Sequence, residues 1–184
     1  MNYDKKDKEA VIAAICNSKR KIFDFEKGVD PSLWGDREVM EAAVANNGRN
    51  LKWASNELKA DPILLVTMAL ANNGHAIQHA AKEFRSNPDF VKMAISRDGD
   101  TLQYTAEHLR SEREIVKIAV TTNGHALQYA TEHLRSDREI VEIAVTTNGR
   151  ALEYATERLR ADKTICEKAI LSRGKAIQFA GTPT

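Results

Sequence analysis

The chain has 184 residues, with 27 Lys or Arg and 26 Asp or Glu, so its formal net charge is +1 at pH 7. Such balanced charge implies no bulk electrostatic partner, and 42% hydrophobic residues are enough to build a core. No stretch has the composition of a Gly/Ser-rich or Pro-rich linker, so we expect a single domain.

The amino-terminal stretch, MNYDKKDKEAV, is charged and contains no long apolar run. We therefore expect neither a secretory signal nor a membrane span. Cys16 and Cys166 lie near opposite ends of the chain, which argues against a disulfide framework and for a reducing compartment such as the cytoplasm. Both replace apolar residues of predicted helices, so we expect them to be small buried hydrophobes.

Glycine recurs along the chain with a period of 26 residues once and 25 thereafter, at Gly48, Gly74, Gly99, Gly124, Gly149 and Gly174. A degenerate copy precedes them, with Lys19 at the glycine position. A fixed period of this length is typical of stacked helical repeats. We expect an N-terminal cap repeat over 1–35, five repeats over 36–60, 61–86, 87–111, 112–136 and 137–161, and a truncated repeat over 162–184.

Each repeat is predicted to be a tight hairpin of two helices. In the first helix, about 137–147, the apolar residues cover an arc of roughly 200°, so the helix should be buried on more than one side. In the second, about 125–135, they cover a narrower arc, which leaves one side in water. Gly124 fits a left-handed position after the first helix, and Asn123 fits the same turn.

Helix starts are indicated by residues that cap amide groups. Ser136 with Glu139, and Ser111 with Glu114, have the spacing of a capping box, although Asp137 or Glu112 is an alternative cap. Pro62 and Pro88 lie just inside the starts of their helices, where proline is tolerated.

A small residue occupies one position of the first helix in every copy: Ala14, Ala43, Ala69, Ala94, Ala119, Ala144 and Ala169. This pattern indicates a close approach by another segment. A unit of about 25 residues cannot bury its apolar surface alone, so neighbouring units should stack. The predicted fold is an all-α solenoid of about seven short two-helix repeats, with no sheet.

The stretch DREIVEIAVTTNGRALEYATERLR resembles the consensus of a helical repeat family catalogued as domain of unknown function forty-one-sixteen. The resemblance covers about 36–180, with a weaker extension to Asp7, and rests on the D-R-E, N-G and A-L-x-Y-A elements. It implies a helical-repeat array, with an interaction role or that of a secreted effector delivered into a host cell. The family brings no catalytic residue or ligand.

An aromatic ring or histidine stands five residues after each glycine: Trp53, His79, Tyr104, Tyr129, Tyr154 and Phe179. One interpretation is a boundary residue that packs on the neighbouring repeat. The other is a row of stacking platforms, as in helical-repeat proteins that hold one RNA base per unit.

Residues of mixed sign flank this aromatic series one turn away. They are Arg49, His75, Asp100, His125, Arg150 and Lys175 before it, and Glu57, Glu83, His108, His133 and Arg158 after it. A nucleic-acid groove is uniformly basic, so this mixture favours a protein or peptide partner.

Cations close the second helix of each repeat: Lys59, Arg85, Arg110, Arg135 and Arg160. They are candidate contacts to phosphate or to an acidic partner. The simpler interpretation is that they complement the helix dipole and pair with acids of the next helix, such as Asp137 and Glu139.

His75 and His79 have a spacing that can hold a metal, but no further ligand pattern joins them, so we expect no metal and no cofactor. No nucleophile or phosphate-binding motif is present, so we expect no enzyme. The predicted function is an interaction scaffold that binds a protein or peptide along the second helices, without a membrane. Two alternatives stay open: single-stranded RNA binding, and a targeting module of a longer effector or enzyme chain.

Overall fold

The computed structural model describes residues 4–18, 25–71 and 73–173 of the chain. In these ranges every secondary-structure element is helical and no strand occurs. The chain divides into two compact units, 1–90 and 91–184. No helix in the described ranges is both long and apolar enough to cross a bilayer.

The first unit contains α-helices, 3₁₀-helices and one π-helix. In chain order its elements are α1 (Lys8–Asn17), α2 (Phe25–Gly28), η1 (Pro31–Leu33), α3 (Arg37–Asn46), η2 (Gly48–Trp53), α4 (Asn56–Lys59), the π-helix η3 (Leu64–Leu70), η4 (Gly74–His79) and α5 (Lys82–Arg85). Helix α6 (Pro88–Arg97) begins at the end of this unit and continues into the second.

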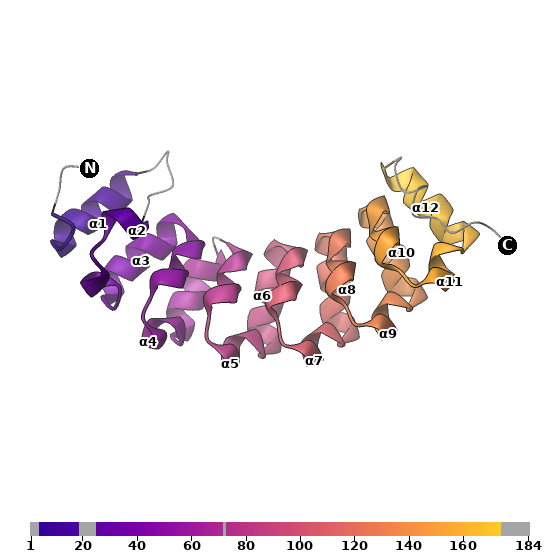
Figure 1. Ribbon diagram of the computed structural model, residues 1–184, viewed down its shortest axis with the longest axis horizontal. Coiled ribbons are helices and arrows are strands. Elements are labelled where there is room, and N and C mark those ends of the chain that lie inside the picture. The colour runs from indigo at the N-terminus through magenta and orange to yellow at the C-terminus, as the bar shows by residue number, and fades with distance from the viewer. Residues whose placement is uncertain (1–3, 19–24, 72, 174–184) are drawn as a thin grey trace. The chain divides into compact units, whose positions relative to one another are not determined.

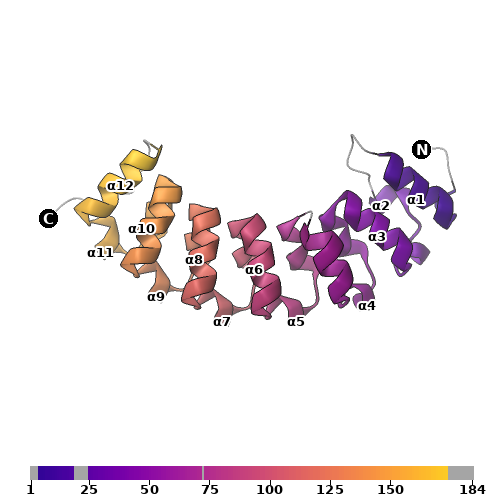
Figure 2. The same ribbon diagram turned by 180° about the vertical axis from the view of Figure 1, so that it is seen from behind.

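The second unit repeats one pattern of long helix, 3₁₀-helix and short helix. Its elements are η5 (Gly99–Tyr104), α7 (Glu107–Arg110), α8 (Arg113–Thr122), η6 (Gly124–Tyr129), α9 (Glu132–Arg135), α10 (Arg138–Thr147), η7 (Gly149–Tyr154), α11 (Glu157–Arg160) and α12 (Lys163–Arg173). Figure 1 shows α8, α10 and α12 side by side, with the short helices α7, α9 and α11 together at one edge, and the reverse view in Figure 2 agrees.

The prediction of a continuous second helix over 125–135 is wrong. The chain forms a 3₁₀-helix to Tyr129, then Ala130 and Thr131 adopt extended conformations before α9 begins. The break has a cause outside the repeat, because the amide of Thr131 donates to the carbonyl of Arg110 in the preceding repeat at 3.1 Å. The amide of Thr156 likewise donates to Arg135 at 3.1 Å, so a backbone bond joins consecutive short helices.

The left-handed role predicted for Gly124 is also wrong, since its backbone lies outside that region. Helix α8 ends at Thr122, and Asn123 is extended, with its side-chain oxygen accepting from the amide of His125 at 3.1 Å. Glycine is required here by a close contact. A Cβ on Gly124 would lie 2.3 Å from the carbonyl oxygen of Ala144 in the next repeat.

The small residue of the long helix is thus explained by the glycine of the preceding repeat. The same clash would occur between Gly99 and Ala119, and between Gly149 and Ala169. All three alanines are fully buried, as are the β-branched residues Val120 and Val145 beside two of them. The helical-repeat solenoid predicted from the sequence is confirmed, with three helical segments in a repeat instead of two.

Helix starts differ partly from the predicted capping boxes. The carboxylate of Asp137 caps α10 by accepting from the amide of Ile140 at 3.0 Å, which confirms the alternative cap. Ser136 instead ends α9, and its hydroxyl donates to the carbonyl of His133 at 2.7 Å. Glu112 precedes α8 without a side-chain cap bond, and Pro88 opens α6 as expected.

The one 26-residue interval contains the π-helix η3. An α-helix that gains one residue can keep its flanking turns in phase by widening locally to i→i+5 hydrogen bonds. Leu64 and Leu65 at the start of the widened turns, and Leu70 at their end, are all buried. The insertion therefore leaves the core contacts of this repeat in register.

Several predicted positions lie outside the described residues, namely Lys19, Gly174, Lys175 and Phe179. The cysteine prediction is only partly right. Cys16 is exposed, and Cys166 is half-buried, with its thiol donating to the carbonyl of Arg160 at 3.0 Å.

Candidate functional site

The aromatic series occupies one structural position, the last residue of the 3₁₀-helix. Trp53 and His79 take this place in the first unit, and Tyr104, Tyr129 and Tyr154 take it in the second. All five side chains are half-buried. The backbone turns away immediately afterwards into the extended link, so each ring stays at the boundary between core and solvent.

Residues before the aromatic series contact the next repeat along the chain. The ring of His125 lies 5.8 Å from the ring of Tyr154 in an edge-to-face arrangement. Burial raises the pKa of the Tyr129 hydroxyl, and the nearby carboxylate of Asp100 raises it further. Tyr129 and Tyr154 thus each lie near a variable side chain from the preceding repeat, which is Asp100 for Tyr129 and His125 for Tyr154.

The hydroxyls of Tyr129 and Tyr154 are neutral near physiological pH, because the pKa of each is raised. Burial, followed by a hydrogen bond with Glu153, raises the pKa of Tyr154 to about 12. A neutral phenol both donates and accepts hydrogen bonds while its ring offers apolar area. This combination suits contact with peptide groups and side chains.

The first unit has a different version of the same surface. The rings of Trp34 and Trp53 lie 5.0 Å apart, and the ammonium of Lys52 lies 4.3 Å from the Trp53 ring centre. Burial and then the charges of Lys59, Lys52 and Arg49 lower the pKa of His79 to about 4. His79 is therefore a neutral ring beside three cations.

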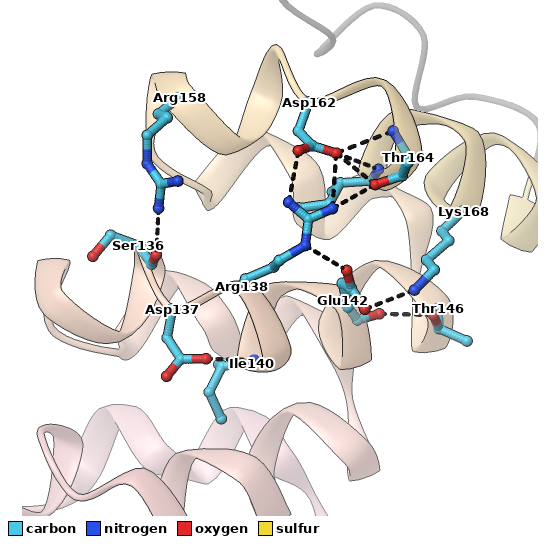
Figure 3. A network of polar contacts seen from close by, with 11 residues as sticks. Ser136, Asp137, Arg138, Ile140, Glu142, Thr146, Arg158, Asp162, Thr164 and Lys168 are labelled. Carbon is cyan, nitrogen blue, oxygen red and sulfur yellow. Dashed lines mark hydrogen bonds and ion pairs between the residues drawn. The ribbon is translucent and has the colours of Figure 1, made fainter.

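The charged and histidine residues that follow the aromatic series in the sequence lie on the short helices, whereas the aromatic residues themselves end the 3₁₀-helices. His108 and His133 are exposed at the second position of α7 and α9. Arg158 occupies that position in α11, and its guanidinium donates to the carbonyl of Ser136 at 3.2 Å (Figure 3). Of the earlier flanking positions, Arg150 is exposed and His75 is half-buried.

The predicted cations do close the short helices, as the last residues of α4, α5, α7, α9 and α11: Lys59, Arg85, Arg110, Arg135 and Arg160. Their predicted pairing with acids of the next helix is wrong for Asp137 and Glu139. Arg113 binds both, with Nε 3.2 Å from Asp137 and Nη2 2.6 Å from Glu139, and Lys117 also binds Glu139 at 2.9 Å.

An inter-repeat ladder of ion pairs on the long helices was not predicted. Arg138 reaches Asp162 at 2.6 Å and Glu142 at 3.0 Å, and Glu142 accepts from Lys168 at 2.6 Å (Figure 3). The guanidinium of Arg138 holds the pKa of Asp162 well below its usual range. The signal was present in the D-R-E element, whose Arg and next Asp are 24 residues apart.

The same pattern occurs in the first unit, where Arg37 pairs with Asp61 and Lys8 pairs with Asp36 at 3.0 Å. These pairs are exposed, so each contributes little to stability, and they lie where the long helices of consecutive repeats meet. The shallow surface depression beside Glu142 and Lys168 holds charges that already bind each other, so it is a weak candidate for a ligand site.

Metal ligands do not gather in the described part of the chain, where no group of three His, Cys, Asp or Glu side chains has suitable geometry. His75 directly follows Gly74 at the start of the 3₁₀-helix η4, and His79 is the last residue of that helix. Their predicted α-helical i, i+4 geometry is therefore absent, since a 3₁₀-helix turns every three residues.

Comparison with known families supports the resemblance stated from the sequence. The family model described as Domain of unknown function (DUF4116) matches residues 64–110, 112–160 and 137–182. These tandem matches cover more than half of the chain. No match was found among curated proteins or among solved structures. By these matches along its repeated sequence, the chain belongs to the DUF4116 family.

Proposed function

We propose that this protein is a non-enzymatic interaction scaffold that binds a protein or peptide partner. The binding surface is the tyrosine strip, defined as Tyr104, Tyr129 and Tyr154 with the adjoining Asp100 and His125. The observation that carries the proposal is the pairing of a constant, half-buried ring with a variable side chain from the repeat before it. Constant scaffold residues beside variable contact residues are the usual way in which repeat proteins bind partners.

The chemistry of the strip favours a polypeptide over a bulk polyanion. Tyrosine rings supply large contact area at low conformational cost, and their hydroxyls hydrogen-bond to backbone groups. Asp100 and His125 differ in charge, so adjacent repeats present different neighbours to a partner. The proposal includes a reducing compartment such as the cytoplasm, which both free cysteines support.

Peptides selected from a phage-displayed random library on the immobilised chain provide the test. We expect the triple variant Tyr104→Ala, Tyr129→Ala, Tyr154→Ala to lose about tenfold or more in affinity, since rings at an interface contribute strongly. The triple Tyr→Phe variant should retain much of the affinity, because it keeps the rings. Affinity is measured by fluorescence anisotropy.

A matched control is Gln103→Ala with Gln128→Ala, because these exposed residues directly precede two of the tyrosines. The control should bind as the parent chain does. Thermal unfolding of all variants separates binding from stability. If the Tyr→Ala variant binds selected peptides with unchanged affinity while its Tm falls sharply, the tyrosines serve packing alone and the proposed surface is wrong.

A further inference from the structure

Two arginine positions of the repeat differ in how their charge is satisfied. Arg113 and Arg138, near the starts of long helices, bind carboxylates of the next repeat. The second position forms the arginine row, defined as Arg110, Arg135 and Arg160 at the ends of α7, α9 and α11. Within the part of the chain that the structure describes, no side-chain hydrogen bond or ion pair satisfies these three guanidinium groups.

Two members of the arginine row also carry a buried donor without an acceptor. The Nε atoms of Arg110 and Arg135 are shielded from solvent and have no hydrogen-bond partner. A buried unsatisfied donor destabilises a folded protein, so its occurrence in consecutive repeats needs an explanation. The terminal Nη atoms of the same guanidinium groups are not shielded in this way, and these are the donors that an acceptor on a ligand can reach.

A second buried group without a hydrogen-bond partner occurs in the residue that is bonded to each of these arginines through the backbone. Thr131 follows Arg110 across the repeat boundary, and their backbones share a hydrogen bond of 3.1 Å. Thr156 has the same relation to Arg135, also at 3.1 Å. The hydroxyls of both threonines are buried and unpartnered. Because these hydroxyls are shielded from solvent, the donors that a ligand can reach at each junction are the terminal N–H groups of one arginine, and a carboxylate has two oxygens to accept from them.

The spacing of the arginine row distinguishes between anionic partners. Helices packed in consecutive repeats are separated by roughly 8–10 Å. A polypeptide extended in the polyproline II conformation advances about 3.1 Å per residue with three residues per turn, so side chains at every third residue lie on one face at about this interval. An extended peptide with an acidic residue at every third position can therefore place one carboxylate at each junction.

A uniformly charged nucleic acid fits this surface less well. The same short helices begin with Glu107, Glu132 and Glu157, all of which are exposed. A phosphate backbone has a negative charge at every nucleotide, so some of its phosphates would lie near these glutamates and be repelled by them. A peptide with one carboxylate per repeat avoids this repulsion, because it has no charge between the arginines.

The first unit independently shows a preference for negative charge. Arg49, Lys52 and Lys59 gather around the neutral ring of His79, beside Trp53. In the described residues these three cations also have no carboxylate partner. A partner with acidic side chains complements both units.

We propose that the arginine row binds the carboxylates of an extended acidic peptide segment whose acidic residues recur at every third position. This inference rests on the proposed scaffold function and specifies the chemistry of its partner. The bound carboxylates accept from the terminal N–H groups of Arg110 at one junction and of Arg135 at the next.

Three labelled probes of equal length test the inference by fluorescence anisotropy at about 50 mM salt, where charge interactions are weakly screened. The first is a peptide of about twelve residues with Glu at every third position and Ser, Thr and Gly between. The second has the same composition with its Glu residues contiguous. The third is oligouridine. We expect the first probe to bind at least about threefold more tightly than the second, and oligouridine to bind least.

The variant Arg110→Gln, Arg135→Gln, Arg160→Gln should weaken binding of the first probe by about tenfold or more, as three charge-assisted contacts are lost. The matched control is Lys92→Gln, Arg97→Gln, Lys163→Gln. These cations are exposed in the same unit, and the control changes net charge equally while leaving the row intact. It should bind as the parent chain does, and circular dichroism verifies that both variants remain folded.

Other outcomes overturn the inference in distinguishable ways. If oligouridine binds most tightly and loses affinity in the arginine-row variant, the ligand is a nucleic acid. If both triple Gln variants weaken binding equally, the effect is net charge alone. If neither peptide probe binds while library-selected peptides still depend on the tyrosines, the scaffold proposal survives and the acidic-peptide inference fails. If the selected peptides do not depend on the tyrosines either, both fail.

Discussion

Gly124 and Ala144 show how one atom sets the contact between repeats. The missing Cβ of the glycine leaves room for the carbonyl oxygen of an alanine 20 residues later in the chain. Because the obstructing atom belongs to the backbone, no side-chain rotation can relieve the clash. This close contact explains why both the glycine and the alanine recur in the sequence. The glycine is therefore needed for packing between repeats, whereas the sequence had suggested that it was needed for a left-handed turn.

Replacing Gly124 by Ala should reduce the free energy of unfolding by roughly 1–3 kcal/mol or more, the cost typical of overpacking. Gly35→Ala is the comparison, since a Cβ there would lie 3.9 Å from Ser55, an ordinary contact. That change should be neutral or stabilise by less than about 1 kcal/mol through the unfolded state. Urea unfolding measures both, and equal effects would contradict the packing explanation.

At the element scale, the long helices could be predicted from the sequence and the broken second helix could not. Apolar spacing over Ile140, Val141, Ala144 and Val145 is a local signal, and all four are buried as expected. The stretch from His125 to Arg135 also reads locally as one helix. Its break depends on the bond from Thr131 to Arg110, and a contact with another repeat has no signature in local periodicity.

For the candidate site, the positions of the residues could be predicted from the sequence, but their contact partners could not. The recurrent aromatic position and the cations at the helix ends follow from counting residues after each glycine. The partners of those residues depend on how neighbouring repeats are set against each other, as the contact of His125 with Tyr154 illustrates. The carboxylates expected near Arg135 are instead bound by Arg113, since long helices meet along their own faces.

The π-helix η3 makes a prediction about chain length. Deleting Val66 should convert the widened turns to an α-helix and change the free energy of unfolding by less than about 1 kcal/mol, since i→i+4 bonds replace i→i+5 bonds. Deleting Lys117 from α8 should cost more than about 3 kcal/mol, because each later residue rotates by about 100° and the buried Ala119 loses its place. Equal losses in chemical denaturation would show that the extra residue of η3 is required.

At the scale of the whole molecule, a repeat contacts chiefly its neighbours in the sequence. In such chains stability is a sum of repeat and interface contributions, and local damage remains local. The core of the second unit follows this scheme, because η6 packs between α8 and α10 of its own and the next repeat.

Leu127, fully buried in η6, provides the test of this behaviour. Leu127→Ala should cost roughly 2–5 kcal/mol locally. Hydrogen exchange followed by mass spectrometry should show faster exchange in α8 and α10, with α1 unchanged. A uniform increase over all slowly exchanging amides would instead indicate that the chain unfolds as one cooperative unit.

The backbone bond between consecutive short helices has a consequence for protein engineering. The amides of Thr131 and Thr156 and the carbonyls of Arg110 and Arg135 are main-chain groups, so this connection does not depend on side-chain identity. Whole repeats such as 112–136 and 137–161 should therefore be interchangeable modules. Duplicating one of them would lengthen the array by one interval, and exchanging residues 125, 133, 150 and 158 would vary its surface while the distance between modules stays the same.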